Sequence, residues 1–84
     1  MKFSEIILKV NDVFKDVFDD ENLIINRKTS SNNIEDWDSL NHIILVVEIE
    51  KKLSIRFNSG EISTFKNVGE MCDAILKKQE SDEF

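Results

Sequence analysis

The 84-residue chain has no proline, only two glycines and only one cysteine, and each scarcity excludes a class of structure. The shortage of turn-forming residues disfavours a turn-rich β fold and favours helices. A lone cysteine, Cys72, can form neither an internal disulfide nor a thiolate zinc site. A lone histidine, His42, leaves a His-based metal cluster or a Ser-His-Asp relay without its parts. We therefore expect no catalytic residues and no metal site.

Long apolar runs are also missing, since the longest, Ile43 to Val47, is far shorter than the ~18 residues of a membrane span. Charged residues interrupt the apolar stretch near the start, so we expect no signal peptide. Acidic residues outnumber basic ones by 17 to 11, for a net charge of −6. This balance disfavours nucleic-acid and anionic-membrane partners and favours basic ones. Because a chain this short can build only one core, we expect a single domain over residues 1–84. From the missing membrane span and signal peptide we expect a cytoplasmic protein, and we also expect a monomer.

Apolar residues recur at helical spacing from Phe3 to Phe18, which predicts an amphipathic first helix with Ser4 as a plausible N-cap. No sustained period follows between Asp19 and Asp38, so we expect a long connection in that stretch. Isolated apolar residues should anchor this connection to the core: Leu23, Ile24, Ile25, Ile34 and Trp37.

Two further main helices are expected after the connection. One runs from about Ser39 to Leu53, and the last begins after Asn67, an N-cap whose capping-box partner is Glu70. Between them we expect one short helical turn around Glu61 to Thr64, and residues 79–84 should be frayed. The predicted fold is all-α: a small bundle of three main helices plus one short helical turn, with a long loop between the first two.

The most informative segment is Glu35 to His42, where the long loop meets the second helix. A serine at that point, Ser39, has its hydroxyl near solvent, and the neighbouring helix start offers unpaired N–H groups that favour an anion. Ser39 is therefore well placed to carry a phosphate ester. The alternative is that Ser39, or Asp38, is simply an N-cap.

Most of the net charge lies around this serine. Five acidic residues and no lysine or arginine occur between Thr29 and Glu50, so this stretch holds −5 of the net charge of −6. Such a concentration is typical of a docking surface for basic partners.

The second helix has apolar residues on two sides. Four of them should face the core, with Leu45 at the margin of that side: Ile43, Val46, Ile49 and Leu53. Three others fall on roughly the opposite side: Leu40, Ile44 and Val47. A helix of this kind is either wholly buried or presents one side to a partner. We expect an exposed ridge for partner contact, and the alternative is that the long loop covers it.

The motif Asp38-Ser39-Leu40, at a helix start in a short acidic helical chain, resembles the acyl carrier protein family over nearly the whole chain. In that family the serine matching Ser39 is esterified to 4′-phosphopantetheine by a phosphopantetheinyl transferase, and the arm's thiol carries an acyl group as a thioester. The resemblance implies that Asp38 helps to present the serine and that Leu40 contacts partners. It also implies that the chain is a carrier and not an enzyme. The implied partners of this carrier are the transferase and acyl-processing enzymes with basic docking patches.

The wider motif, from Trp37 to His42, is more similar to carriers of dedicated pathways than to those of central fatty acid synthesis. The resemblance leaves open a fatty-acid, specialised lipid, glycan-modification or polyketide-type pathway. It also implies a set of partner-docking residues: Leu40, Asn41, Ile44, Val47 and Glu48. Two of these, Asn41 and Ile44, replace residues that are often acidic, so partner preference should differ there.

Two alternatives remain open: an aminoacyl or peptidyl carrier protein, and a non-enzymatic helical adaptor in which Ser39 is only an N-cap. We expect His42 to be a partly buried or docking histidine and not a general base. Trp37 should anchor the loop, and Cys72 should be a small core residue. If the cargo is an acyl group, we expect it to be sheltered reversibly between the helices.

Overall fold

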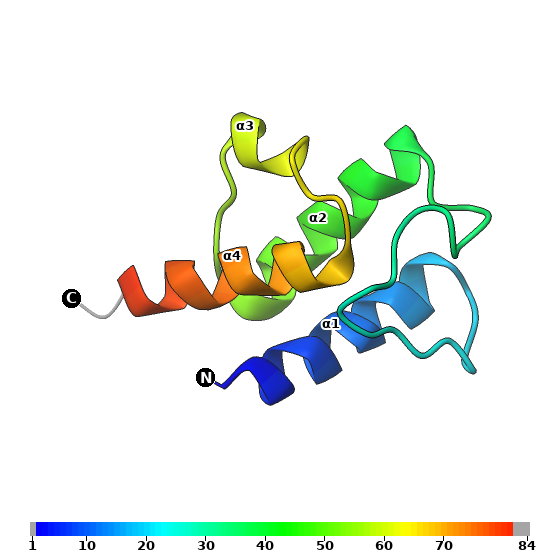
Figure 1. Ribbon diagram of the computed structural model, residues 1–84, viewed down its shortest axis with the longest axis horizontal. Coiled ribbons are helices and arrows are strands. Elements are labelled where there is room, and N and C mark those ends of the chain that lie inside the picture. The colour runs from blue at the N-terminus through cyan, green and yellow to red at the C-terminus, as the bar shows by residue number, and fades with distance from the viewer. Residues whose placement is uncertain (1, 82–84) are drawn as a thin grey trace.

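The computed structural model describes residues 2–81 as a bundle of helices joined by loops (Figure 1). The helices are α1 (Phe3–Val17), α2 (Ser39–Leu53), α3 (Ser59–Ile62) and α4 (Val68–Ser81). No strand occurs among the described residues. The predicted all-α bundle of three main helices and one short helical turn is therefore confirmed, and α2 has the bounds expected from the sequence.

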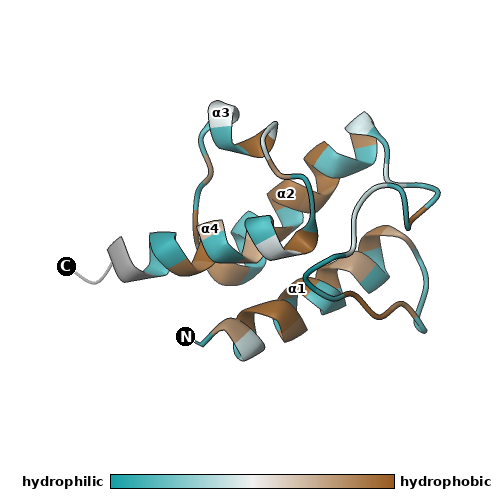
Figure 2. Ribbon diagram, viewed as in Figure 1, coloured by the Kyte–Doolittle hydropathy of each residue, from teal (hydrophilic) through white to brown (hydrophobic). Residues whose placement is uncertain are grey.

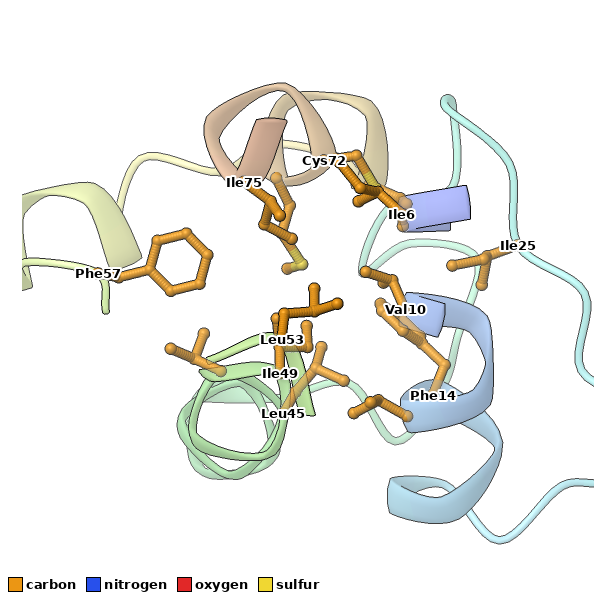
Figure 3. Packing of buried hydrophobic residues seen from close by; sticks show 14 of the residues in the cluster. Ile6, Val10, Phe14, Ile25, Leu45, Ile49, Leu53, Phe57, Cys72 and Ile75 are labelled. Carbon is orange, nitrogen blue, oxygen red and sulfur yellow. The ribbon is translucent and has the colours of Figure 1, made fainter. Parts of the chain in front are cut away.

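One apolar core joins the three long helices. Helix α1 packs against both α2 and α4, and Figure 3 shows side chains from all three helices converging on the space between them. The α1 side chains in this core recur at helical spacing: Ile6, Val10, Val13 and Phe14. Cys72 is fully buried in α4, as expected for a small core residue.

Helix α1 begins without the cap that its sequence suggests. Its N-cap is Lys2, whose side chain makes no capping hydrogen bond, and Ser4 lies inside the first turn. The prediction of Ser4 as N-cap was therefore wrong. Packing of the apolar stripe against α2 and α4 stabilises this helix, and such packing commonly outweighs local capping preferences.

The buried side of α2 is rotated from the predicted one. Leu45 is fully buried at the centre of this side, whereas Ile43 is 52% exposed. The predictions of Ile43 as core-facing and of Leu45 as marginal were both wrong, because the sequence of a helix with two apolar sides does not determine which side is buried. Figure 2 shows hydrophobic colouring over much of the middle of α2. Leu40, Ile44 and Val47 are exposed, as predicted.

The short helix α3 begins at Ser59, earlier than the predicted turn at Glu61 to Thr64. A complete capping box sets this start, because the Asn58 side chain accepts from the Glu61 N–H and the Glu61 carboxylate accepts from the Asn58 N–H. The Asn58 N–H and then Lys78 hold the pKa of the Glu61 carboxyl below its ordinary value. The 2.6 Å ion pair between Glu61 and Lys78 joins α3 to α4.

Helix α4 is capped as predicted by Asn67, whose side-chain oxygen accepts from the Glu70 N–H at 2.9 Å. The Glu70 carboxylate accepts from the Lys66 N–H at 3.2 Å, one residue before the position that a capping box uses. The helix continues to Ser81, so residues 79–81 of the segment predicted to be frayed are helical in this structure. Residues 82–84 of the predicted frayed segment lie outside the described residues.

Residues 18–38 form the long connection between α1 and α2, and no helix occurs within it. Four of the five predicted anchors are buried or partly buried: Leu23, Ile25, Ile34 and Trp37. The fifth, Ile24, is 83% exposed, so its prediction as an anchor was wrong.

Asn11 of α1 explains the exposure of Ile24. Its side chain donates to the Leu23 carbonyl at 3.2 Å and accepts from the Ile25 N–H at 2.7 Å. This pairing resembles that of a neighbouring strand, along which successive side chains point to opposite sides. Leu23 and Ile25 turn towards the core, and Ile24 points away.

The same connection caps the start of α4. The Val68 N–H donates to the Thr29 carbonyl at 2.8 Å, and the Gly69 N–H donates to the Arg27 carbonyl at 2.9 Å. These bonds satisfy two of the N–H groups that a helix start leaves unpaired. The Arg27 side chain also binds Asp73 through two hydrogen bonds, of 3.2 and 2.8 Å, which hold the pKa of the Asp73 carboxyl below its ordinary value.

The helix ends are arranged at opposite sides of the molecule. In Figure 1, α1 begins and α4 ends on one side, whereas α2 begins on the other side, next to the long connection. None of the helices in residues 2–81 is both long enough and apolar enough to cross a membrane.

The contact of Gly69 with the long connection yields a stability prediction. A Cβ at residue 69 would lie 2.9 Å from the Arg27 carbonyl oxygen, so Gly69→Ala should force a shift that costs about 1–3 kcal/mol. Gly60→Ala is the matched control, because a Cβ there meets only the Asn58 side chain, at 3.5 Å. The free energy of unfolding of both variants can be measured by urea unfolding, followed by circular dichroism. Equal stabilities of Gly69→Ala and Gly60→Ala would contradict the role of the Arg27 contact.

Candidate functional site

Ser39 is the first residue of α2, and its side chain is exposed. The N-cap is the preceding residue, Asp38, whose carboxylate accepts from the Asn41 N–H at 2.8 Å. Of the two capping possibilities, the structure therefore selects Asp38. Among the described residues the Ser39 hydroxyl makes no hydrogen bond, so it faces solvent with both its donor and its acceptors available.

Further hydrogen bonds hold the start of α2 in place. The Asn41 side chain donates to the Asp36 carbonyl at 2.7 Å, and the His42 N–H donates to the Asp38 carbonyl at 2.9 Å. The N–H groups of Ser39 and Leu40 precede the first intrahelical bond, and no partner for them occurs in residues 2–81. An unencumbered hydroxyl and two free N–H groups therefore lie together at a fixed helix start.

A surface hollow of about 480 Å³ lies beside Ser39, between the start of α2, the long connection and the segment around α3. Its apolar lining comes from Trp37, Ile43, Ile62 and Phe65, and its polar lining from Ser31, Asp38, Ser39, His42 and Ser63. The hollow is thus mixed in character, with hydroxyls next to aromatic and aliphatic groups.

His42 joins α2 to the long connection and to α3. Its Nδ1 accepts from the Trp37 indole N–H at 3.0 Å, and its Nε2 lies 2.9 Å from the Ile62 carbonyl oxygen. Because an indole N–H can only donate, Nδ1 carries no proton, and the neutral ring must donate from Nε2 to Ile62. We refer to these two hydrogen bonds as the His42 relay.

The relay agrees with what was expected of its two side chains. His42 is partly buried, and Trp37 is a buried anchor of the connection, as predicted. The indole ring packs edge-on against Phe14 of α1, with 5.2 Å between ring centroids. Trp37 therefore separates the hollow from the core.

The acidic residues around Ser39 divide into two groups. Glu35, Asp36 and Asp38 are all exposed at the start of α2. Glu50, by contrast, accepts from the Phe57 N–H at 2.8 Å, and Glu48 lies 3.7 Å from Lys51. The surplus negative charge is therefore concentrated at the helix start and does not extend along the outer face of α2.

The outer face of α2 consists of exposed apolar side chains: Leu40, Ile43, Ile44 and Val47. Of the other residues predicted for docking, Asn41 is partly buried and bonded to Asp36, whereas Glu48 is exposed at the edge of this face. The structure therefore brings Leu40, Ile44 and Val47 together, adds Ile43, and places Asn41 in the support of the helix start.

Seven residues of the hollow were not among the predicted site residues: Ser31, Trp37, His42, Ile43, Ile62, Ser63 and Phe65. The capping box Asn58 to Glu61 is visible in the sequence and could have placed α3, and with it Ile62 and Ser63. No local pattern marks Ser31, which comes close only because of the path of the long connection.

Comparison with known proteins identifies the family. No protein-family model and no curated protein sequence matches the chain. Among solved structures, it is similar to a holo acyl carrier protein from Geobacter metallireducens, with a TM-score of 0.82 and 39% sequence identity. The match covers 89% of this chain and 86% of that one. The chain belongs to the acyl carrier protein family.

Membership of this family indicates a carrier and not a catalyst. In keeping with this role, the residues at the hollow include one histidine, and both of its ring nitrogens are engaged in structural hydrogen bonds. Within residues 2–81 no group of three or more His, Cys, Asp or Glu side chains is arranged to hold a metal ion.

The carrier's own thiol should be unreactive in the folded state. Cys72 is fully buried, and burial raises its thiol pKa to about 12, so at pH 8 the thiolate fraction is about one in ten thousand. We expect no thiol of the unmodified native protein to react with Ellman's reagent at pH 8, and one thiol per chain to react after unfolding in urea. Rapid reaction of one thiol per chain in the native protein would contradict the burial of Cys72.

Proposed function

We propose that the chain carries acyl intermediates as thioesters on a 4′-phosphopantetheine arm attached to the Ser39 hydroxyl. The observation that supports this most strongly is the exposed, unbonded hydroxyl of Ser39 at the start of α2, beside a hollow. The solved relative is a holo carrier, and its similarity covers most of this chain.

The residues around Ser39 fit such an arm. The negative charge of a phosphodiester on this oxygen would face the N–H groups of Ser39 and Leu40 at the positive end of the α2 dipole. Asp38 holds this end of the helix in place through its hydrogen bond to Asn41. When attached, the arm supplies an accessible thiol, which the chain otherwise lacks because Cys72 is buried.

In this proposal the chain is a substrate of other enzymes. A phosphopantetheinyl transferase attaches the arm, and acyl-loading and acyl-transferring enzymes act on its cargo. The pathway is of the fatty-acid, specialised lipid, glycan-modification or polyketide type, and the carrier acts as a cytoplasmic monomer. Identifying the group carried by protein isolated from its native cell would distinguish these pathways. An aminoacyl group in place of an acyl group would show that the chain is an aminoacyl carrier.

The outer face of α2 is the proposed docking surface for these enzymes. Leu40, Ile43, Ile44 and Val47 form an exposed apolar ridge that starts one residue after Ser39. Glu35, Asp36 and Asp38 add negative charge at the Ser39 end of this ridge. A complementary partner has an apolar groove with basic residues at the end that receives Ser39.

Attachment at Ser39 can be tested by intact mass. Incubation with a broad-specificity phosphopantetheinyl transferase and coenzyme A should add the mass of one phosphopantetheine to the wild type and none to Ser39→Ala. In the modified native protein one thiol per chain, that of the arm, should also react with Ellman's reagent, since the buried Cys72 does not react.

Ser59→Ala is the matched control for this experiment, because Ser59 is also an exposed serine that begins a helix directly after its N-cap. This variant should be modified like the wild type. The absence of an adduct on the folded wild type, or an adduct on Ser39→Ala, would refute attachment at Ser39.

The docking surface can be tested with two equally exposed leucines. Leu40, on the outer face of α2, is 70% exposed, and Leu8, on α1, is 68% exposed. Leu40→Ala should lower the transferase's kcat/KM for the carrier about tenfold, as expected when a central apolar contact is lost. Leu8→Ala should leave it unchanged. Equal effects of the two substitutions would contradict a docking role for this face.

A further inference from the structure

The hollow beside Ser39 ends at the His42 relay. Trp37, His42 and Ile62 all line the hollow, and their hydrogen bonds join the long connection to α2 and α2 to α3. Behind them lies the closed core, in which Phe14 and Leu45 are fully buried. A group that enters from Ser39 therefore meets the relay before it reaches the core.

Opening the relay for an apolar chain is unfavourable. An alkyl chain that passed between α2 and α3 would have to separate His42 from the Ile62 carbonyl or from the Trp37 indole N–H. It offers no donor or acceptor in return, so these partly buried polar groups would lose their partners. Trp37 would also lose its edge-on contact with Phe14.

The hollow itself favours a different kind of cargo. Ser31 and Ser63 contribute hydroxyls, and Phe65 and Ile43 contribute apolar surface. A short acyl group with polar substituents can contact both kinds of surface without disturbing the relay. A long alkyl chain gains no enclosed apolar site there.

We propose that His42 is a positioning residue that closes the core to cargo, so that this carrier keeps short or polar acyl groups in the surface hollow. This inference rests on the proposed attachment at Ser39. It differs from the expectation drawn from the sequence, in which acyl cargo lies between the helices.

The test compares wild-type carrier loaded with butyryl, 3-hydroxybutyryl or hexadecanoyl phosphopantetheine. Amide hydrogen exchange at Leu45 and Val46 reports entry into the core, and the rate of thioester cleavage by hydroxylamine reports shelter of the cargo. We expect all three loaded forms to have the same core protection, and we expect the butyryl and 3-hydroxybutyryl forms, which fit the hollow, to be cleaved no faster than the hexadecanoyl form. Slower cleavage and stronger protection of Leu45 and Val46 in the hexadecanoyl form of the wild type would overturn the proposal.

His42→Phe keeps a planar ring but removes both hydrogen bonds, so the open state should become roughly 5- to 150-fold more populated. The hexadecanoyl form of this variant should then be cleaved more slowly than its butyryl form. His42→Gln offers one acceptor and one donor and should restore the wild-type behaviour. A merely structural role for His42 would lower stability without any dependence on cargo length, and that outcome would also overturn the proposal.

The two proposals fail in different ways. If the wild type accepts no phosphopantetheine, attachment at Ser39 is refuted, and the inference falls with it. If the arm is attached and the wild type shelters a hexadecanoyl group, only the closing role of His42 is refuted. The wild-type comparison needs no variant, so it decides the matter even if His42→Phe does not fold.

Discussion

The fixing of residues 18–38 onto the helices is the constraint on which the rest of the structure depends. A connection of this length would cost much conformational entropy if it packed only through isolated side chains. Here its backbone is bonded to Asn11 of α1 and to the first turn of α4. Trp37 then packs against α1 and binds His42 of α2. The position of Asp38 and Ser39, and therefore of the site, follows from these attachments.

Local patterns predicted the parts of the fold that local physics decides. The apolar stripe of α1, the bounds of α2 and the Asn67 cap of α4 are each written in a few neighbouring residues. The orientation of α2 could not be predicted in the same way, because Ile43 and Leu45 are equally apolar and tertiary packing chooses between them. The site divides similarly. Ser39, the proposed attachment point, was singled out by its motif, whereas the His42 relay joins residues 5 and 20 positions apart, which no local pattern records.

The two sides of α2 separate its packing in the bundle from the docking role that we propose for its outer face. Leu45, Val46, Ile49 and Leu53 hold the bundle together from within. The outer face remains available to other molecules, and its few charges lie at the edges or are turned towards the backbone, as Glu50 is towards Phe57. Recognition by such a face depends more on shape and apolar area than on long-range attraction, which acts mainly through the acidic helix start.

The start of α1 and the end of α4 lie on the side of the molecule away from the start of α2 (Figure 1). A tether attached near either of these helix ends would leave the Ser39 side unobstructed. The carrier could then be fixed to a solid support, or fused to a second domain, while Ser39 still faces a soluble enzyme. The fold therefore suits immobilised and linked assemblies as well as free diffusion.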